Sequence, residues 1–491
     1  MKKLVTFASE IRLSALVCSS IAVLLTACGG GTADQGNSAQ ASQNLAMVSS
    51  VDATTGASAP AVMAAAQLQQ DGSAASAQAG NGASVAMATP AQGEFALAGY
   101  GAASASEQNP NVAGSSLIVS DSSTMQLATV SATAPAPSLA TTPATTYNYY
   151  LSPTGNDNNS GTSSAPWRTF VRAAKAARAG TTFWVAPGTY AGGFKTTVSG
   201  TASARIYWVS TTRWGAKIVP PASSLNNIAW DSRGSYNDII GFDVDGTSSQ
   251  SGTKWTHGIY SAGSYDMIRN NHVHNIATSV TCTSAGASAI GVDSYYYGVN
   301  TDVLSNLVND IGPAGCRYDQ GIYISTSGTV KNNVVYRVAE AGIHLWHDAH
   351  NVIISNNTVT TSDTGIIVGA GDYYHTTGPD DYTMVYNNIV FDNKMGVSEQ
   401  GKTGTHNQYR NNLVYQNPTY NWSLKNGLTN YNTVASNPLF IGYSRTGSPN
   451  LRISTSSPAV GRGTSSYAYA TDFLDRPRNS TTGYDIGAYQ H

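Results

Sequence analysis

The sequence has little charge, few cysteines and no recognisable redox motif. Only 11% of its 491 residues are Asp, Glu, Lys or Arg, and it holds four cysteines. Residues 1–28 carry a net charge of +2 and residues 29–145 a net charge of −6. The total charge of −2 therefore leaves about +2 for the rest of the chain. So small a charge argues against nucleic-acid binding. The absence of a nucleotide, flavin or haem motif argues against a redox role.

The start of the chain also lacks an apolar run of transmembrane length. Basic residues precede an apolar segment at 13–25, which predicts an export signal rather than a membrane span. The segment ends in Leu-Thr-Ala-Cys, which resembles the lipobox of bacterial lipoproteins. The resemblance implies a signal peptide over 1–28 and lipidation of Cys28. It also implies an exported protein anchored in the outer membrane, facing the periplasm or the cell surface. An ordinary signal peptide is the alternative.

Residues 29–145 lack Lys and Arg altogether. They consist mainly of Ala, Ser, Gly, Thr and Gln and carry six acids. This composition predicts a disordered linker that holds a folded domain, residues 146–491, away from a membrane.

Two cysteines remain outside the signal and its lipobox, Cys282 and Cys316. An exported protein meets an oxidising compartment, where a pair of thiols tends to close. We therefore expect a disulfide between them.

Two short patterns alternate from residue 258 onward. The first, a glycine followed by alternating apolar residues, begins at Gly258, Gly321, Gly342, Gly365 and Gly396. The second, a polar pair followed by alternating apolar residues, begins at Asn270, Ser305, Asn332, Asn356, Asn387 and Asn411. Short strands with period-two alternation, repeated every 20-odd residues, predict a coil of parallel strands and turns. The expected fold is all-β, a single-stranded right-handed parallel β-helix.

Stacked coils explain both patterns structurally. Apolar side chains of successive coils would form a continuous core, and aligned Asn side chains would form amide ladders in the turns. Because the Asn pairs recur in almost every coil, we interpret them as scaffold. Residues 170–179, closed by Gly180, predict a short amphipathic helix that caps the open end of the coil.

Three segments near residue 150 and one near the end resemble secreted pectate-lyase-like β-helix proteins. They are Tyr-Tyr-Leu-Ser-Pro-Thr-Gly-Asn-Asp at 149–157, Ala-Pro-Trp at 165–167, Val-Ala-Pro-Gly-Thr-Tyr at 185–190 and the closing segment 457–489. The resemblance implies the fold but not the reaction, since this superfamily includes lyases, hydrolases, epimerases and adhesins. The motif set of polygalacturonase-like hydrolases is incomplete here, and the Asp-His signature of pectate lyases is absent.

Aligning the coils on their glycines places residues of equal offset on one face. Two positions before the glycine, the column contains Asp319, Glu340 and Asp363; two positions after it stand Tyr323 and His344. The loops that follow add Tyr, Trp, His and Asp side chains, which suit a saccharide groove. We expect substrate binding by Tyr323, Trp346, His347, Asp348, Tyr373, Tyr374 and His375. An exposed aromatic ladder that only stabilises the sheet is the alternative.

Stacked carboxylates need a cation, a raised pKa or open solvent. With a calcium ion on Asp319, Glu340 and Asp363, the site would hold a uronate and favour β-elimination. His344 would be the base and Tyr323 or His347 the acid, with a nearby lysine as a substitute base. Without a cation, Asp319 and Glu340 would stand about 5 Å apart, a distance suited to a retaining glycosidase. Simple solvation would make them a polar turn column.

The sequence therefore predicts a surface-anchored polysaccharide lyase acting on an acidic, uronate-containing polysaccharide, with Asp319, Glu340 and His344 as catalytic residues. A glycoside hydrolase or uronate epimerase on the same fold is one alternative. A non-catalytic exopolysaccharide-binding protein or adhesin is the other. We expect a monomer, no nucleic-acid partner, and a membrane contact only through the lipid at Cys28.

Overall fold

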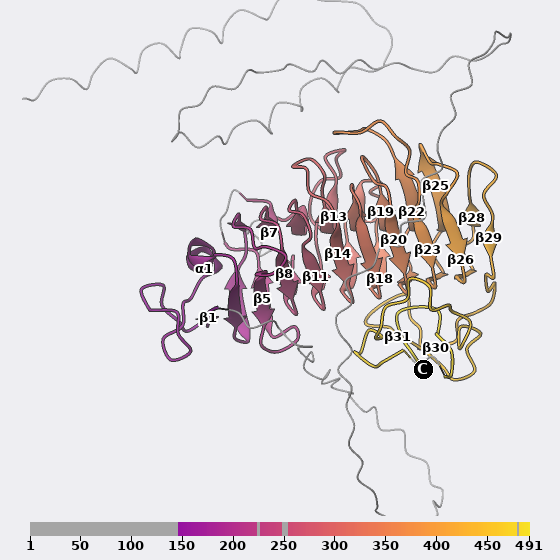
Figure 1. The fold of residues 1–491 in the computed structure, drawn as a ribbon. Helices are drawn as coiled ribbons and strands as arrows, with labels where there is room; N and C mark the ends of the chain where they lie inside the picture. Colours follow the sequence, from indigo (N-terminus) through magenta and orange to yellow (C-terminus); the bar gives the residue numbers. More distant parts are fainter. Residues whose placement is uncertain (1–145, 223–225, 248–253, 479–480) are drawn as a thin grey trace, which may run out of the picture. The chain divides into compact units, whose positions relative to one another are not determined.

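The computed structural model describes residues 146–222, 226–247, 254–478 and 481–491. The expected signal peptide with Cys28 and the expected linker 29–145 lie outside these residues. Nearly all regular structure in the described residues is β-strand, arranged as three parallel sheets that stack along one axis (Figure 1). Within the same residues, no helix is long and apolar enough to cross a membrane.

Each coil contributes one strand to each of three sheets, which we call sheets I, II and III in the order of the chain. Sheet I contains, in stacking order, β4 (Phe194–Thr196), β7 (Ile228–Ser232), β10 (His257–Ser261), β13 (Ala287–Val292), β16 (Asp319–Ile324), β19 (Ala341–Leu345), β22 (Thr364–Ala370), β25 (Met395–Gly401) and β28 (Tyr420–Ser423).

Sheet II contains β1 (Tyr147–Leu151), β2 (Thr181–Val185), β5 (Ile206–Ser210), β8 (Asn237–Ile240), β11 (Met267–Arg269), β14 (Thr301–Leu304), β17 (Gly328–Lys331), β20 (Val352–Ser355), β23 (Met384–Tyr386), β26 (Gln408–Arg410) and β29 (Asn430–Tyr431). Sheet III contains β3 (Gly188–Ala191), β6 (Ala216–Val219), β9 (Asp243–Asp245), β12 (His272–His274), β15 (Leu307–Ile311), β18 (Val334–Val338), β21 (Thr358–Thr360), β24 (Ile389–Phe391) and β27 (Leu413–Tyr415).

The strands stack in strict register, as the glycine alignment predicts. Ile322 pairs with Ile343, Ile343 with Ile366, and Ile366 with Val397, and all four side chains are fully buried. Rungs of a parallel sheet lie about 4.8 Å apart, so these side chains form one continuous apolar column inside the coil. The expected fold class, the right-handed parallel β-helix, is confirmed.

The corner between sheets II and III is built by the Asn pairs. The first residue of each pair has a positive φ, between 53° and 63°, which Asn tolerates better than most residues. The second is buried, and its side-chain amide donates to the equivalent Asn one coil further on at 2.9–3.1 Å, through Asn271, Asn306, Asn333, Asn357, Asn388 and Asn412. These residues form the amide ladder expected from the sequence, which we call the Asn ladder.

The glycines of the first pattern line the corner between sheets III and I. A Cβ atom at Gly342 would lie 2.3 Å from Val359 Cγ1, and one at Gly321 would lie 2.6 Å from the carbonyl oxygen of Gly342. The repeat requires glycine there because the chain turns directly against its neighbouring coil. The same corner holds a second amide ladder, Asn393 to Asn417 to Asn421, which the sequence patterns did not predict.

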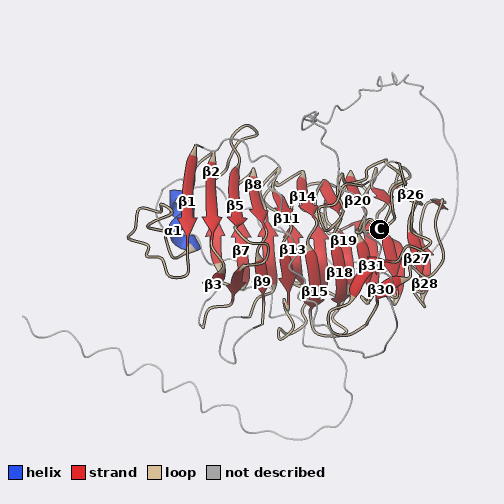
Figure 2. Ribbon diagram, turned by 90° about the horizontal axis from the view of Figure 1, so that it is seen from below, coloured by secondary structure: helices blue, strands red, loops and turns tan. Residues whose placement is uncertain are grey.

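One helix in the described residues, α1 (Phe170–Ala176), lies at the β1 end of the coil (Figure 2). The Thr169 hydroxyl caps it by accepting from the backbone N–H of Arg172, and Phe170 stacks on Phe194 with ring centroids 4.5 Å apart. The helix is shorter than the expected 170–179 because Ala177 already adopts an extended conformation, which leads the chain into β2.

The C-terminal segment carries an antiparallel pair, β30 (Phe440–Gly442) and β31 (Asn450–Ile453). It packs its own core residues, including Leu451 and Phe473, against Val334 and Tyr336 of sheet III. The buried guanidinium of Arg478 donates to Asn332 Oδ1 and to the carbonyl of Gly487. The segment thus covers part of sheet III and the adjacent Asn corner.

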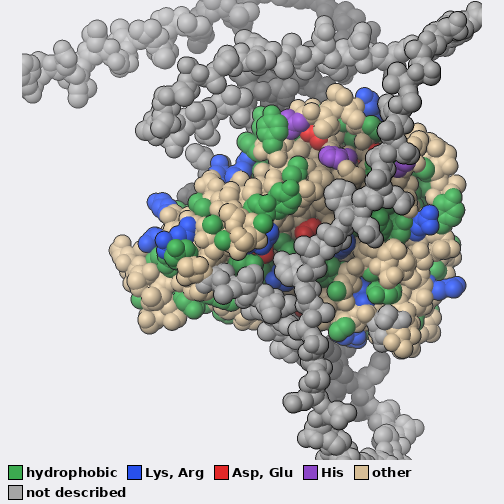
Figure 3. All heavy atoms as spheres, in the orientation of Figure 1, with side chains coloured by type: hydrophobic (Ala, Val, Ile, Leu, Met, Phe, Trp, Pro, Cys, Tyr) green, Lys and Arg blue, Asp and Glu red, His purple; other side chains and the backbone are tan. Residues whose placement is uncertain are grey.

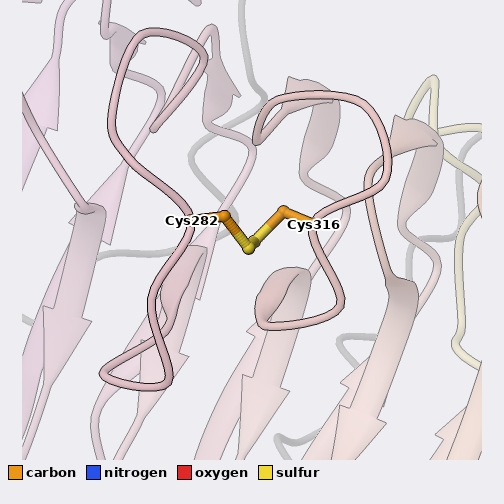
Figure 4. Close-up of a disulfide and its surroundings, with 2 residues drawn as sticks. All are labelled: Cys282 and Cys316. Atoms are coloured by element: carbon orange, nitrogen blue, oxygen red, sulfur yellow. A yellow bond between two sulfur atoms is a disulfide. The ribbon is translucent and has the colours of Figure 1, made fainter. Parts of the chain in front are cut away.

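The expected disulfide is present. Cys282 and Cys316 are joined with a Cα–Cα distance of 5.5 Å, and the bond links the two long loops that lead into β13 and β16 (Figure 4). It therefore connects two adjacent coils at the start of sheet I.

Candidate functional site

The acidic column lies where the chain enters sheet I. Asp319, Glu340 and Asp363 occupy equivalent positions of adjacent coils, as predicted, and the Glu340 N–H donates to the Asp319 carbonyl. Burial raises the pKa of Asp319 to about 6. Burial and then the Asp363 charge raise the pKa of Glu340 to about 7. Asp363 itself pairs with Lys394 at 3.0 Å.

The three carboxyl groups do not converge on one point. Among the described residues, the metal-type groups whose ligand atoms lie within 4.8 Å of one another do not include them. Asp319 turns toward Gly312 and is almost fully buried, and burial alone accounts for its raised pKa. The expected pair of Asp319 and Glu340 and the expected calcium ion on this column stay predictions.

The outer face of sheet I carries the expected row of aromatic side chains. Tyr323 of β16, His344 of β19 and Ile367 of β22 are directly paired in register. The His344 ring meets the Tyr323 ring edge-on at 5.4 Å and the Trp346 ring at 5.8 Å. This row stands near the ends of the sheet I strands, whereas the acidic column stands where those strands begin. The structure thus separates Asp319 and Glu340 from His344.

His344 is the least satisfied polar group of this row. Both of its ring nitrogens are buried, and neither has a hydrogen-bond partner. Burial, followed by the nearby His347, lowers the pKa of His344 to about 3. The ring is therefore neutral at pH 7 and offers one donor and one acceptor without partners.

The loop after β19 places Trp346 and His347 over the end of sheet I. A Cβ atom at Gly371 or Gly401 would lie within 3 Å of the Trp346 ring, so both glycines give the indole room. The indole N–H donates to Asp372 Oδ2 at 3.2 Å. His347 Nδ1 lies 2.7 Å from the Asp372 carbonyl, which makes it the donor; Nε2 then accepts from the Tyr374 hydroxyl at 2.9 Å.

Asp348 is almost fully buried and accepts from the backbone N–H groups of Tyr374, His375 and Thr376 and from the Ser294 hydroxyl. It therefore holds the insertion loop in place, and its expected contact with substrate stays a prediction. These bonds lower its pKa, against the effect of burial. Tyr373 is also turned inward, since its hydroxyl is buried without a partner.

Two loops meet above this face. His375 of the insertion stacks on Tyr297 at 3.8 Å, and its Nε2 lies 3.2 Å from the Tyr295 carbonyl. Tyr295, Tyr296 and Tyr297 are all more than half exposed. Figure 3 shows histidine side chains beside hydrophobic and acidic ones along the upper edge of the molecule. The run of three tyrosines in a Ser- and Gly-containing loop was the available sequence signal, and it was missed.

A polar network continues the row toward β7. The Tyr260 hydroxyl donates to Asp293, which also accepts from the Ser325 hydroxyl at 2.9 Å. Arg233 pairs with Asp231 and lies over the Tyr296 ring at 3.9 Å. Sequence reasoning missed Asp231, Arg233 and Asp293 because their coils lack the glycine on which the others were aligned.

Gly291 leaves a gap in this row. It is paired with Tyr260 on one side and Tyr323 on the other, so the two tyrosines lie two rungs, or about 9.6 Å, apart. A Cβ atom at Gly291 would lie 3.5 Å from Tyr260 Cδ2. The Tyr260 ring therefore covers part of the space that Gly291 leaves.

Residues 153–197 match a family model described as a protein of unknown function, DUF1565. An uncharacterized protein YwoF of Bacillus subtilis (strain 168) is 27% identical over 355 residues, covering 60% of this chain and 75% of that protein. The register of the stacked strands decides the fold. The described residues form a parallel β-helix.

Solved structures of this β-helix type resemble the chain at low identity. Pectate lyase Pel9A has a TM-score of 0.48 at 17% identity, covering 71% of this chain and 97% of that one. XylC in complex with xylose has a TM-score of 0.39 at 15% identity, covering 60% and 70%. A rhamnogalacturonan lyase has a TM-score of 0.32 at 14% identity, covering 65% and 97%. The reaction must therefore be argued from the side chains of this β-helix.

Proposed function

We propose that this β-helix binds an acidic polysaccharide along the outer face of sheet I and cleaves it by β-elimination at His344. The observation that carries the proposal is the neutral His344 imidazole, whose two buried nitrogens have no partner between the Tyr323 and Trp346 rings. Buried polar groups without partners are rare, and a ligand that supplies the partners explains this one.

The surroundings of His344 suit a sugar chain. Pyranose rings present apolar faces that stack on aromatic side chains and hydroxyls that need hydrogen-bond partners. The outer face of sheet I supplies both over several rungs, from Tyr260 to His344. Arg233, three rungs from Tyr323 along the sheet, offers a cation to a uronate carboxylate of the same chain.

The proposed elimination uses two groups of the row. A nitrogen of His344 takes the proton from C5 of the uronate, the electron pair forms the C4–C5 double bond, and the C4–O bond breaks. The leaving oxygen receives the proton of Tyr323, whose hydroxyl stays protonated because burial raises its pKa well above 10. A bound uronate anion beside His344 raises the pKa of the imidazole and so strengthens the base.

A second candidate function is non-catalytic binding of the same polysaccharide. The low pKa of free His344, about 3, is the observation that favours it, because a base that weak is poorly matched to neutral pH. In this case the imidazole only exchanges hydrogen bonds with sugar hydroxyls.

One experiment separates the two. The full chain is mixed with pectate, alginate, glucuronan and bacterial exopolysaccharides, each with calcium and with a chelator. The ultraviolet absorbance of an unsaturated uronide and the release of reducing ends are followed, and binding is measured by affinity electrophoresis. Rising absorbance establishes the lyase, and retardation without cleavage establishes the binder. If the protein neither cleaves nor binds any of the uronate polymers, both proposals are overturned.

We further propose that the protein acts as a monomer tethered to the outer membrane by a lipid on Cys28, the cysteine of the Leu-Thr-Ala-Cys sequence. Cells fed a radiolabelled fatty acid should label the wild-type chain and not Cys28→Ser. Equal labelling of both would contradict the anchor.

A further inference from the structure

The outer face of sheet III carries a compact group of imidazoles and carboxylates, away from the row on sheet I. His272 and His274 of β12 pair in register with Asp243 and Asp245 of β9. Asp243 Oδ1 lies 2.8 Å from His274 Nε2 and 3.3 Å from His272 Nδ1. In the described residues, these three side chains are the group whose metal-ligand atoms all lie within 4.8 Å of one another.

We propose that Asp243, His272 and His274 form a binding site for a divalent transition-metal ion, with zinc as its expected occupant. Zinc binds imidazole nitrogen and carboxylate oxygen at about 2.0–2.1 Å in tetrahedral geometry, which puts neighbouring ligand atoms about 3.3 Å apart. The 3.3 Å separation matches that edge, and the 2.8 Å separation is shorter than it. Three protein ligands leave a fourth position for water.

The surroundings of His272 independently fix the tautomer that a metal requires. Its Nε2 lies 2.9 Å from Asn309 Oδ1, so this nitrogen is a donor and carries a proton. Asn309 is held in turn by its own bond to Asp310 at 2.6 Å. In the neutral ring, the Nδ1 lone pair then points at the Asp243 carboxylate, another acceptor. A cation between the two satisfies both, and an orienting bond on the far ring nitrogen is typical of metal-bound histidine.

Lys217 is the competing cation of the site. Its ammonium lies 3.0 Å from Asp243 Oδ2 and 3.1 Å from Asp245 Oδ2. These contacts use Asp243 Oδ2. Oδ1 accepts from Nε2 of His274, whose Nδ1 accepts from the Asn275 side-chain amide at 2.8 Å, so a bound ion would have to displace the Nε2 proton. The Lys217 side chain is 39% exposed and is free to withdraw into solvent. Its charge opposes a second cation and should weaken metal binding.

The donor set selects the class of ion. Two imidazoles and one carboxylate suit zinc, cobalt, nickel or copper, whereas calcium and magnesium prefer sites made of oxygen alone. Because the ligands come from two adjacent coils, the ion would join β9 to β12. Binding to the folded state only would raise the stability of the whole coil.

The test is a titration of the untagged full chain with Co²⁺, followed by zinc displacement. Tetrahedral Co²⁺ on nitrogen and oxygen ligands gives visible absorption bands that the free ion lacks, so the signal reports coordination geometry and not activity. We expect one ion per chain and loss of the bands on adding zinc. His272→Gln and His274→Gln should each weaken binding about 100-fold, with circular dichroism confirming that the variants are folded.

Two further variants keep the proposal falsifiable. His406→Gln removes an exposed histidine that pairs with Asp381 elsewhere and should leave the Co²⁺ signal unchanged. Lys217→Met should tighten binding about tenfold, because it removes the competing ammonium. Equal Co²⁺ binding by the wild type and His274→Gln, or no visible bands in the wild type at millimolar cobalt, would overturn the site.

Discussion

The Asn ladder is buried and the His344 row is half-buried, and the polar side chains of the two differ in their hydrogen bonding. In the ladder, every side-chain amide from Asn271 to Asn388 donates to its neighbour one coil further on. In the row, the two nitrogens of His344 are buried without partners.

The difference teaches where function resides in a repetitive fold. A side chain repeated in every coil finds its partner in its own copy, so repetition satisfies it and makes it scaffold. A side chain that occurs once has no such copy. His344 stands between Tyr323 and Ile367, neither of which supplies a matching donor or acceptor. An unrepeated polar residue on the outer face is therefore the better marker of a site.

Breaking the ladder should have the largest effect on stability. Asn333 accepts from Asn306 and donates to Asn357 and to the Val303 carbonyl, all of them buried. Asn333→Ala leaves these groups without partners, so we expect a loss of about 4 kcal/mol in the free energy of unfolding. Denaturant titration measures it, and Asn158→Ala, at an exposed position, should change it by less than about 0.5 kcal/mol. Equal effects would remove the contrast between scaffold and surface.

The disulfide should rank next. It closes a loop of 34 residues, for which the chain-entropy model gives a stabilisation of about 3.8 kcal/mol. The double variant Cys282→Ser/Cys316→Ser should unfold at correspondingly lower denaturant, and reduced wild type should behave alike. A double variant as stable as the oxidised protein would show that the loops entering β13 and β16 are held by other contacts.

Two histidines on the same outer face sharpen the comparison directly. His257 is also neutral at pH 7, because burial lowers its pKa to about 4, but its Nδ1 bonds with the buried Ser288 hydroxyl at 3.0 Å. His257→Phe should cost about 1 kcal/mol by stranding that hydroxyl, whereas His344→Phe should stabilise the protein by up to about 1 kcal/mol. Thermal unfolding of both variants checks the signs, and a clear loss of stability in His344→Phe would mean that its nitrogens have partners.

The smallest effect concerns pH. The pKa of Glu340, about 7, lies above its ordinary value of 4.5, so the folded state holds the proton more tightly and stability falls as pH rises from about 4.5 to 7. Glu340→Gln has no carboxyl group that titrates, so this loss of stability with rising pH is absent from the variant. Because Glu340 is only half-buried, solvent screening reduces the expected difference to roughly 1 kcal/mol, in favour of the variant at pH 8. A difference between variant and wild type that stays constant from pH 4 to pH 8 would contradict the raised pKa.

Repetition made the fold predictable from sequence. The glycine and Asn patterns gave the coil, the register and the ladder, because each pattern depends on contact with its own copy. The Cys282–Cys316 bond followed from counting the cysteines that remained. The short helix α1 was placed correctly but made too long, since nothing in an Ala-rich run marks the residue where the chain turns extended.

The candidate site was less predictable because it depends on side-chain direction and on unrepeated loops. Equal offset from glycine placed Asp319 and Glu340 on adjacent rungs, but it could not show that Asp319 turns toward Gly312. The hydrogen bonds by which Asp348 holds the insertion could not be predicted either, since the partners it binds belong to that unrepeated loop. The Asp243 group on sheet III was missed because the glycine alignment compared positions on sheet I, whereas His272 and His274 follow the Asn270-Asn271 pair, which was interpreted as scaffold.

The central claim, that the unpartnered His344 serves a polysaccharide, is tested most directly by the pair His344→Phe and His257→Phe. Both variants are compared with the wild type for binding and cleavage of the uronate polymer that the panel selects. The account predicts that His344→Phe loses cleavage, or at least about tenfold in affinity, while it remains folded, and that His257→Phe keeps both activities. Unchanged binding and cleavage in His344→Phe would contradict the account.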